Sequence, residues 1–408
     1  MKKEYEHWVA LSYANKDEEK YQIATKAAAE LESIFQDGFF WDRKNVEELS
    51  KAEDFKEKLR KLFGSAKYAV ILWSDNYIQA PFAQVELEKI YEKERENEEC
   101  CYYIIDIGGD ITDTKYHNQL DIHKEGWEKE LKDIIHNRIK KNILKDTIAS
   151  AKEKEDYGVY VQTLKRESNL AQWHKDYDWN LFALQYVGED GKEIANTVLW
   201  GKTWDYIEDN FKSIMEVLPQ NGQKTLRICL NCHLSIAFML GYRYGDMEKK
   251  PFKKNLQLYS GNQVTPFDFR GCTGKYKKEK PPVEIYSENS GEKGDVIYII
   301  SLTNKANPGI LEEVKLFLEK ESIVYSKVYL LQQELEIHNP SELMNIAEFI
   351  SDHIFQKAKI PGQTIHLFMR TMAPLAFLLG GKSDFWGHVQ LYDFFQNRGT
   401  YGASLKKI

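Results

Sequence analysis

Two segments of this chain repeat one another without a gap, and this repeat constrains the fold more than any other feature. Residues 225–241 read TLRICLNCHLSIAFMLG, and residues 364–380 read TIHLFMRTMAPLAFLLG. Each copy is followed by a short strand pattern that ends in Gln-Leu-Tyr, at 256–259 and at 389–392. A solenoid needs about three or more repeats. Two copies of strand, tight turn, short apolar helix and strand therefore predict a duplicated α/β domain with a pseudo-two-fold axis.

The segments around the two copies predict the rest of this duplicated domain. In the second half the apolar patterns predict, in order, strand 295–302, helix 308–321, strand 324–333 and helix 341–357. In the first half a strand is expected at 179–187 and a helix at 200–218, but no middle strand is found. Residues 260–294 are rich in Gly, Pro and Lys and predict a long loop. The two halves are thus expected at about 158–260 and 294–408.

A separate pattern of alternating strands and helices occupies residues 1–145. The order expected is strand 8–13, helix 18–35, strand 38–43, helix 55–66, strand 68–73, helix from 81, strand 101–107 and helix 127–143. Strands that alternate with helices predict a parallel sheet with right-handed crossovers. The polar stretch that follows, residues 146–157, is predicted to be a linker to the duplicated domain.

The strongest candidate site lies in the stretch 68–87, YAVILWSDNYIQAPFAQVEL. A buried-strand pattern ends at short polar residues, and Pro81 suits the first turn of the next helix. Phe82 and Glu86 are four residues apart, so they share one helix face. Open α/β sheets place their ligand sites at the C-terminal ends of such strands. The alternative is that Glu86 is one more charge on a solvated helix.

These residues resemble the third strand and following helix of Toll/interleukin receptor (TIR) domains. Ser74-x-x-Tyr77 and then Phe82-x-x-x-Glu86-Leu87 match a family pattern of Ser-x-x-Tyr and Trp-x-x-x-Glu-Leu. Leu11-Ser12-Tyr13 resembles the first strand, and Phe40-Trp41-Asp42 the segment before a flexible loop. The glycine usual in that loop is missing from 43–49. The resemblance covers about the first 145 residues and implies a flavodoxin-like fold with a parallel sheet.

The TIR resemblance also implies an activity. In enzymatic family members the matching glutamate is catalytic in NAD glycohydrolysis, so Glu86 is the expected catalytic residue. The residues expected to bind substrate are Phe82, Ser12, Tyr13, Asp42, Ser74 and Tyr77. NAD is then a substrate and no cofactor is expected, since no Gly-x-Gly-x-x-Gly follows the first strand. Many TIR domains only make protein contacts, so a non-enzymatic scaffold is the alternative.

The C-terminal region resembles SAVED domains over about residues 158–408. The matching pieces are the two Phe-x-Leu-Gly helices, the Gln-Leu-Tyr strands and Trp200-x-Lys202-x-x-Asp205. SAVED domains are duplicated Rossmann-like (CARF-like) sensors of cyclic oligonucleotides, fused to effectors of bacterial anti-phage (CBASS) signalling. The resemblance implies a cyclic oligoadenylate as activating ligand, with the trinucleotide as the favoured ring size.

Equivalent strand ends in a duplicated sheet meet at the interface between the halves, where helix N-termini and backbone amides suit phosphates. The candidate nucleotide-binding residues are Lys202, Trp200, Asn231, His233, Ser301, Thr303, Arg370, Thr371, Phe394 and Tyr401. Arg370 can contact a phosphate bidentately, Lys202 can act as a point charge, and aromatic rings can stack adenines. The alternatives are an Arg370 paired with a surface carboxylate and a Trp200 in the core.

Composition and charge narrow the function classes. The net charge of −7 over 408 residues argues against a general nucleic-acid or anionic-membrane binder. Five cysteines fit a reducing cytosol, and Cys229-x-x-Cys232 on a strand pattern indicates buried thiols rather than zinc. Scattered histidines predict no metal site. The charged N-terminus and the lack of a long apolar run predict a cytoplasmic protein without a membrane anchor.

Together the two resemblances imply a ligand-activated NAD glycohydrolase. Nucleotide binding to the second domain is expected to assemble a homo-oligomer or filament through both domains, and so to activate hydrolysis of NAD to nicotinamide and ADP-ribose. The alternative is a scaffold that nucleotide binding assembles and that has no activity of its own.

Overall fold

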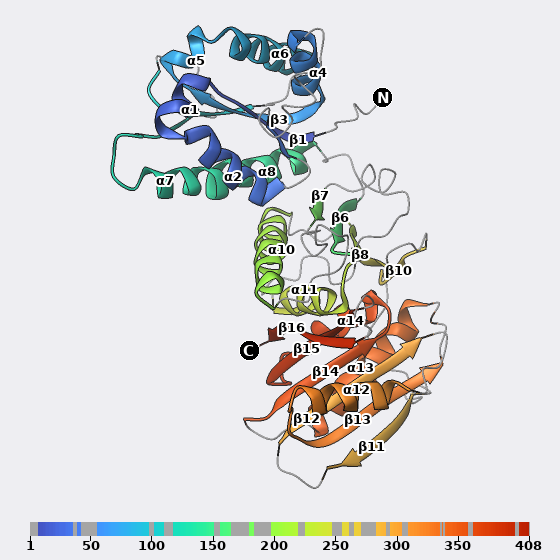
Figure 1. Cartoon of the computed structure of the whole chain (residues 1–408). Coiled ribbons are helices and arrows are strands. Elements are labelled where there is room, and N and C mark those ends of the chain that lie inside the picture. The colour runs from blue at the N-terminus through green and yellow to red at the C-terminus, as the bar shows by residue number, and fades with distance from the viewer. Residues whose placement is uncertain are drawn as a thin grey trace. The chain divides into compact units, whose positions relative to one another are not determined.

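A computed structural model gives the fold. It describes residues 7–35, 39–41, 55–97, 102–109, 117–150, 156–164, 179–182, 197–218, 225–246, 255–260, 265–270, 283–290, 294–303, 309–334, 337, 339–357, 362–395 and 400–407. The chain divides into two compact units, Met1–Lys152 and Glu153–Ile408. Each is taken by itself below (Figure 1).

The first unit is a parallel sheet with the strand order β2-β1-β3-β4-β5. Its strands are β1 (His7–Ser12), β2 (Phe39–Phe40), β3 (Ala66–Trp73), β4 (Tyr102–Asp106) and β5 (His117–Gln119). Its helices are α1 (Asn15–Tyr21), α2 (Ile23–Phe35), α4 (Phe55–Ser65), α5 (Asp75–Gln79), α6 (Pro81–Asn97), α7 (Trp127–Asp133), the π-helix η3 (Ile134–Ile139) and α8 (Lys140–Ser150). This is the flavodoxin-like order, so the predicted fold class is confirmed.

The sheet of the first unit separates two hydrophobic layers. Val9 and Leu11 of β1 pack with α2 and the α7–η3 helices, whereas Ala10 packs with α4 and α6 (Figure 1). Neighbouring strand residues point to opposite faces. Ser12 therefore falls on the same side as Ala10, toward α6.

Four details of the first unit differ from the sequence prediction. One is the short helix α5, which precedes the helix expected from residue 81. The helix expected at 18–35 is broken at Gln22, whose φ is 51°, and Glu18 accepts hydrogen bonds from the backbone and hydroxyl of Thr25 at the start of α2. Strand β5 was not predicted, because HNQ has no strand pattern. The last helical run continues to Ser150, and strand β6 begins at Asp156, so both overlap the linker predicted at 146–157.

The second unit contains two sheets, with strand orders β10-β9-β8-β6-β7 and β11-β13-β12-β14-β15-β16. The first has β6 (Asp156–Gln162), β7 (Trp179–Phe182), β8 (Thr225–Asn231), β9 (Leu256–Ser260) and β10 (Phe267–Asp268), with α10 (Thr197–Val217) and α11 (Leu234–Asp246). The second has β11 (Glu284–Asn289), β12 (Asp295–Thr303), β13 (Tyr325–Glu334), β14 (Thr364–Arg370), β15 (His388–Phe395) and β16 (Thr400–Lys407), with α12 (Ile310–Lys320), α13 (Pro340–Lys357) and α14 (Ala373–Gly380).

The two sheets repeat one topology. The parallel cores β7-β6-β8-β9 and β13-β12-β14-β15 have the same order, so β6 corresponds to β12. Strand β6 is the strand missing from the sequence analysis of the first half. The stretch 260–294, expected to be a loop, contains the antiparallel edge strands β10 and β11. Strand β16, which pairs antiparallel with β15, was not predicted either. Apart from these corrections, the predicted duplication is confirmed.

The two repeated helices α11 and α14 cross at their glycines. A Cβ on Gly241 would lie 1.8 Å from the backbone oxygen of Phe377, and a Cβ on Gly380 would lie 1.8 Å from that of Phe238. Each Phe-x-Leu-Gly motif thus supplies one carbonyl and one glycine to the same contact. Glycine allows this close backbone approach because it has no side chain.

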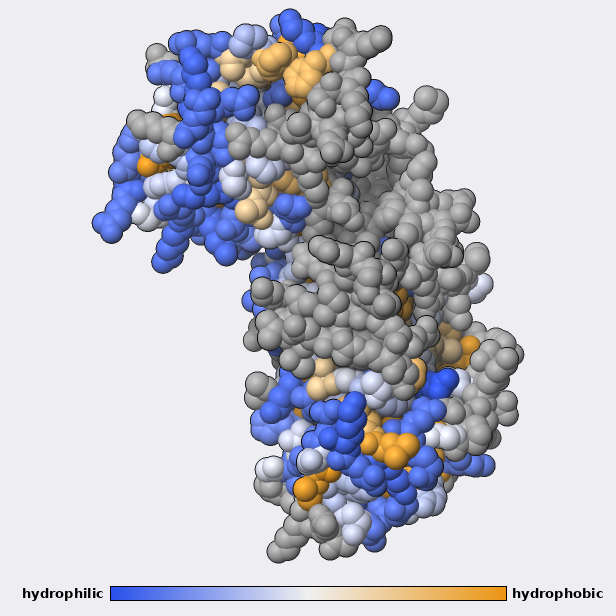
Figure 2. Space-filling view, viewed as in Figure 1, coloured by the Kyte–Doolittle hydropathy of each residue, from blue (hydrophilic) through white to orange (hydrophobic). Residues whose placement is uncertain are grey.

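The described surface is mostly hydrophilic on the face in Figure 2, with small separate hydrophobic patches. Such scattered apolar side chains are normal for globular proteins. Within the described residues, every helix is too short or too polar to span a bilayer.

Candidate active site

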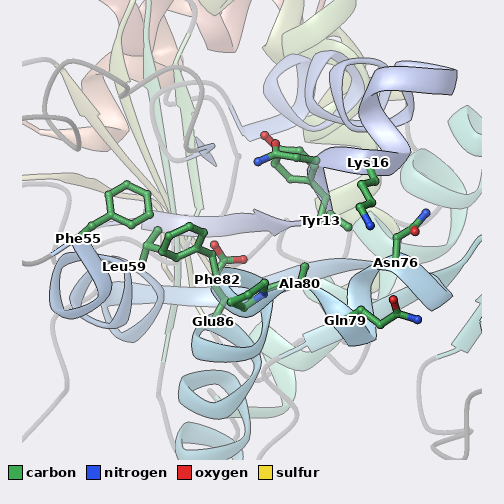
Figure 3. Close-up of a pocket in the computed structure, with 13 residues that line it drawn as sticks. Tyr13, Lys16, Phe55, Leu59, Asn76, Gln79, Ala80, Phe82 and Glu86 are labelled. Atoms are coloured by element: carbon green, nitrogen blue, oxygen red, sulfur yellow. The ribbon is translucent and has the colours of Figure 1, made fainter.

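A cavity of about 400 Å³ lies at the C-terminal ends of β1 and β3 in the first unit (Figure 3). These two strands are the point at which the order 2-1-3-4-5 reverses, which is where such sheets bind ligands. Tyr13 and Lys16 reach it from the segment after β1, Phe55 from α4, and Phe82 and Glu86 from α6. The i,i+4 spacing predicted from sequence therefore brings Phe82 and Glu86 to one wall.

Glu86 is a buried carboxylate at this cavity, with 7% of its surface exposed. The Ser12 hydroxyl donates a hydrogen bond of 2.5 Å to Glu86 Oε2. Ser12 Oγ also lies 2.7 Å from the Tyr77 hydroxyl. Because a serine has one hydroxyl proton, Tyr77 is the donor to Ser12. The three residues form a directed chain that ends on the carboxylate and fixes its orientation.

The surroundings of Tyr77 keep its phenol protonated. Burial raises the pKa of the Tyr77 phenol well above its usual value, and the Glu86 charge raises that pKa further. The hydrogen bond with Ser12 has the opposite, smaller effect. Tyr77 is therefore protonated at neutral pH and remains a hydrogen-bond donor, so the chain does not add a second negative charge beside Glu86.

A second buried carboxylate holds the turn between β3 and α6. Ser74 Oγ accepts from the Tyr77 backbone at 3.0 Å and donates to Asp17 at 2.5 Å, and Asn76 Nδ2 donates to Asp17 at 2.6 Å. Ser74 thus caps α5 and ties it to α1. These contacts fix the two segments that flank the cavity.

The apolar wall of the cavity is formed by two phenylalanines. Phe82 is 48% exposed, and its ring meets that of Phe55 edge-on, with centroids 4.9 Å apart. An exposed aromatic at the mouth of a polar site offers a stacking surface to a planar ligand group.

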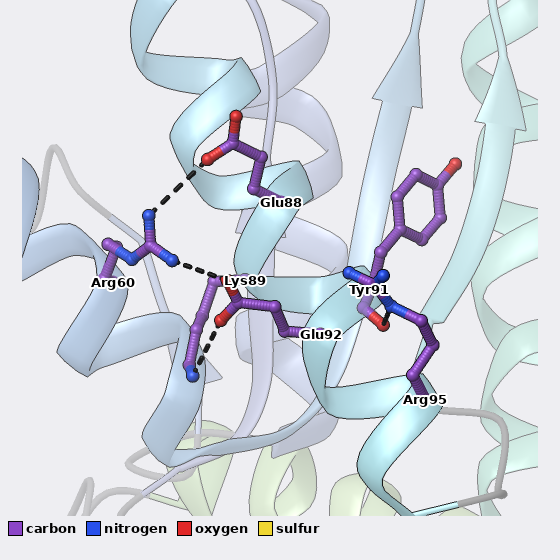
Figure 4. Close-up of polar contacts among 6 residues, drawn as sticks. All are labelled: Arg60, Glu88, Lys89, Tyr91, Glu92 and Arg95. Atoms are coloured by element: carbon purple, nitrogen blue, oxygen red, sulfur yellow. Dashed lines mark hydrogen bonds and ion pairs between the residues drawn. The ribbon is translucent and has the colours of Figure 1, made fainter.

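Glu88 is two positions after Glu86 on α6, so it lies on a different face of the helix. Figure 4 shows its side chain directed toward Arg60 of α4. Its side chain is 65% exposed and lies 3.5 Å from Arg60 of α4. Arg60 also pairs with Glu92 at 2.6 Å, and Lys89 pairs with Glu92 at 3.1 Å. This exposed network connects α4 to α6, and it makes Glu88 a matched control for Glu86.

The structure places five of the predicted substrate residues around Glu86. Tyr13 and Phe82 line the cavity, and Ser12, Tyr77 and Ser74 support it from behind. Asp42 lies outside the described residues. The sequence analysis did not single out Asp17, Asn76, Phe55 or Lys16. The polar run Asn15-Lys16-Asp17 directly after a buried strand was the available signal for Lys16 and Asp17.

In the second unit, the predicted residues after β8 make internal contacts. Asn231 is buried and donates from Nδ2 to the Tyr160 hydroxyl at 3.0 Å. The His233 backbone donates to Thr163 Oγ1 at 2.9 Å, and His233 Nδ1 lies 2.9 Å from the same hydroxyl. These bonds join the ends of β6 and β8, the reversal point of the first sheet.

At the equivalent place in the second half, Ser301 of β12 is the register partner of Arg370 of β14. Ser301 is buried, Thr303 and Thr371 are half-buried, and Arg370 is exposed. Trp200 and Lys202 lie on α10, and their side chains are outside the described residues. Among the candidates whose side chains the structure describes, Arg370 is thus a cation that is accessible to an anion.

Two expectations about this unit need correction. The N-terminus of α11 is already capped, because Asp393 of β15 accepts hydrogen bonds from the backbone and hydroxyl of Ser235. This end of the helix is occupied by a carboxylate from the other half, so it is not available to a phosphate in this arrangement. Tyr401 is buried against Phe317 and Phe368, so its ring is part of the core and not a free stacking surface. Phe394 beside it is 39% exposed.

Among the residues that the structure describes, no group of three or more His, Cys, Asp or Glu side chains is arranged to hold a metal ion.

Comparison with protein families finds two matches. Residues 9–135 match the model described as "TIR domain", and residues 207–406 match "SMODS-associated and fused to various effectors sensor domain", or SAVED. CD-NTase-associated protein 4 of Enterobacter hormaechei subsp. hoffmannii (strain UCI 50) is 25% identical over 215 residues, which are 50% of this chain and 41% of that protein. The aligned region thus spans less than half of that relative's length.

Solved structures similar to this chain include receptors with SAVED/CARF domains. Acinetobacter baumannii Cap4 with the cyclic trinucleotide 3'3'3'-cAAA has a TM-score of 0.44 and 14% identity, and the match covers 87% of this chain and 86% of that one. The same receptor with 2'3'3'-cAAA gives 0.44 and 13%, over 87% and 85%. Moraxella osloensis Cap4 gives 0.43 and 13%, over 90% and 86%.

Proposed function

Because this chain carries a TIR domain at residues 9–135 and a SAVED domain at residues 207–406, we propose that it is an NAD glycohydrolase activated by a cyclic oligonucleotide. The observation that supports the enzymatic part most directly is the buried Glu86, oriented by Ser12 at the β1/β3 cavity. The matched description of SAVED as a sensor domain fused to effectors supports the regulatory part.

The proposed chemistry breaks the N-glycosidic bond of NAD. Nicotinamide leaves with the bonding electrons, the ribosyl carbon develops positive charge, and water adds to give ADP-ribose with loss of a proton. A carboxylate beside that carbon stabilises the charge, as in glycoside hydrolysis. Glu86 has this role in our proposal. Phe82, exposed on the same wall, packs against the nicotinamide or the ribose.

The proposed trigger is a cyclic oligoadenylate, with the trinucleotide as the favoured ring size. Binding to the second unit drives homo-oligomerisation or filament formation through TIR and SAVED domains, and the assembly activates NAD cleavage. NAD depletion would then stop the growth of an infected cell in anti-phage defence. A cytoplasmic location, where NAD is abundant, suits this role.

One observation favours a second candidate function, a non-enzymatic scaffold assembled by the nucleotide. Phe82 stands where the family pattern has tryptophan, so the indole N–H is missing from the cavity wall. A TIR domain without turnover would still make protein contacts in an assembly.

One experiment separates the two functions. The purified full chain is incubated with NAD and a panel of cyclic nucleotides that includes 3'3'3'-cAAA and 2'3'3'-cAAA, and nicotinamide release and particle size are followed together. Nicotinamide release that needs one nucleotide supports the effector. Assembly without nicotinamide release supports the scaffold. If no nucleotide causes either assembly or nicotinamide release, both proposed functions are contradicted.

Reversing the charge of a sensor residue should raise the activating nucleotide concentration. We expect this for Arg370→Glu and Lys202→Glu, because a cyclic oligonucleotide carries one negative charge per phosphate. Losing one charge-assisted hydrogen bond costs roughly 1.5–3 kcal/mol, on the order of 10- to 150-fold in affinity. Saturating nucleotide should restore near-normal turnover, since these residues lie in another unit from Glu86.

The matched control for this charge reversal is Lys320→Glu. Lys320 is exposed in the last turn of α12 and is not among the candidate ligand residues. The measurement is a titration of nucleotide against NAD turnover. Midpoints that stay unchanged for both Arg370→Glu and Lys202→Glu would exclude these two residues from the binding site.

A further inference from the structure

The cavity beside Glu86 has two chemically different sides. Phe55, Leu59, Phe82 and Glu86 lie together on one side of Figure 3, and Lys16, Asn76 and Gln79 lie on the other. The first side is aromatic and anionic. The second side has a primary ammonium and two amide groups, all of which can donate hydrogen bonds. The Asn76 amide already donates one N–H to Asp17 and keeps its second N–H for a ligand.

The charges that line this cavity are few. Among its described lining residues only Glu86 and Lys16 carry a charge. Glu86 is buried and accepts from Ser12, whereas Lys16 is exposed. Within the described part of the chain, Lys16 has no carboxylate partner, so its ammonium is available to a ligand.

We propose that Lys16, with Asn76 and Gln79 beside it, forms the subsite for the pyrophosphate of a dinucleotide substrate. This inference rests on the proposed function and specifies how that site selects its substrate. Lys16 is a specificity-determining residue in this proposal, because it contacts a part of the substrate remote from the bond that breaks.

The order of charges along NAD matches the order of groups in the cavity. The nicotinamide is a planar cation, which suits the Phe82 ring and the Glu86 carboxylate. The ribose comes next, and beyond it the pyrophosphate carries the negative charge. With the nicotinamide and ribose at Phe82 and Glu86, the pyrophosphate extends away from the carboxylate, toward the side that holds Lys16. The reversed orientation would bring the pyrophosphate against Glu86 and the cation against Lys16, and both contacts are repulsive.

The size and construction of the cavity fit a ligand that contacts both sides. Its volume of about 400 Å³ is within the usual range of small-molecule sites. Its two ends are formed by different segments of the chain. The Lys16 side is built by the start of α1 and by α5, and the Phe82 side by α4 and α6. A change at Lys16 therefore leaves the Ser12–Glu86 contact intact.

The test is equilibrium binding to the full chain, with and without 3'3'3'-cAAA, of three probes: NAD, ADP-ribose and nicotinamide riboside, which has no phosphate. We expect Lys16→Gln to weaken NAD and ADP-ribose roughly 5- to 20-fold, within the range of one charge-assisted contact, and to leave nicotinamide riboside unchanged. Lys16→Arg should restore most of the binding. The salt dependence of NAD binding should decrease in Lys16→Gln, because one ion pair is lost.

The control is Lys61→Gln, which removes the same charge from an exposed position on α4 that does not line the cavity. Equal weakening by both variants would mean a general effect of net charge and would overturn the subsite. The subsite would also be overturned if Lys16→Gln bound all three probes as tightly as the unmodified chain does. A third contradicting result would be an unmodified chain that binds neither NAD nor ADP-ribose. The proposed activity fails separately, if NAD binds through Lys16 but nicotinamide is never released.

Discussion

Glu86→Gln should lower nicotinamide release by roughly 100-fold or more, the size of effect seen when a group that stabilises developing charge is removed. The amide keeps the size and shape of the carboxylate but loses its charge. The Ser12 hydroxyl can still donate to the amide oxygen, so the fold and the cavity should persist. The readout is nicotinamide release by the full chain at saturating nucleotide, with nucleotide binding and assembly measured on the same sample.

The matched control is Glu88→Gln, two positions further along the same helix. Glu88 is exposed and pairs with Arg60 at 3.5 Å, and exposed ion pairs contribute only about 0–1 kcal/mol. We therefore expect its turnover to stay within about twofold of the unmodified chain. Loss of turnover in Glu88→Gln with normal turnover in Glu86→Gln would refute the assignment of the catalytic carboxylate.

The contrast between Glu86 and Glu88 shows how much of the site a sequence can predict. Helical spacing alone places Phe82 and Glu86 on one face, because 3.6 residues make one turn. The hydroxyl that orients Glu86 lies 74 positions away at Ser12. Only the pairing of β1 beside β3 brings them together, and no local pattern reports that pairing. The family resemblance was needed to place Ser12 near the glutamate.

Three of the strands that the sequence analysis missed, β5, β10 and β11, share a physical reason. Buried strands such as β3, β8, β12 and β14 have nearly continuous apolar residues, and all of them were predicted. Strand β11 reads EIYSEN and is largely exposed, and β5 and β10 are only three and two residues long. Such edge strands bury too little surface to leave an apolar pattern. Strand β6 is buried, but it follows a run of charges that resembled a linker.

The duplicated unit carries an asymmetry that the repeat alignment could have revealed. Asp393 follows one Gln-Leu-Tyr strand and Ser260 follows the other, while Ser235 of α11 corresponds to Pro374 of α14. Asp393 caps α11 by bonding to Ser235. Proline has no N–H to cap, so the equivalent end of α14 has one donor fewer to satisfy. The differences between the copies thus occur together, at one contact between the halves.

The largest expected effect on stability comes from the glycines where α11 and α14 cross. Gly241→Ala and Gly380→Ala each place a methyl group 1.8 Å from a backbone carbonyl oxygen of the other helix, so the two backbones must move apart. Overpacking of this kind costs about 1–3 kcal/mol and sometimes more, and backbone cannot move aside as a flexible side chain does. The better helix propensity of alanine offsets only about 1 kcal/mol. Because the clash is with backbone, we take the upper end of the overpacking range, about 3 kcal/mol. This gives a net loss of about 2 kcal/mol in the unfolding free energy of the second unit.

Gly201→Ala on α10 is the control for this loss, because a Cβ at Gly201 would meet no atom within 4 Å. There the same substitution should be neutral or slightly stabilising, by up to about 1 kcal/mol. Calorimetry of the full chain would show the difference as a fall of roughly 4–8 °C in the transition of the second unit for Gly241→Ala and Gly380→Ala only. Both halves build the predicted nucleotide site, so nucleotide affinity should fall in the same two variants. If neither Gly241→Ala nor Gly380→Ala changed the unfolding temperature of the second unit, α11 and α14 would not meet at these glycines. The two halves would then be joined by other contacts.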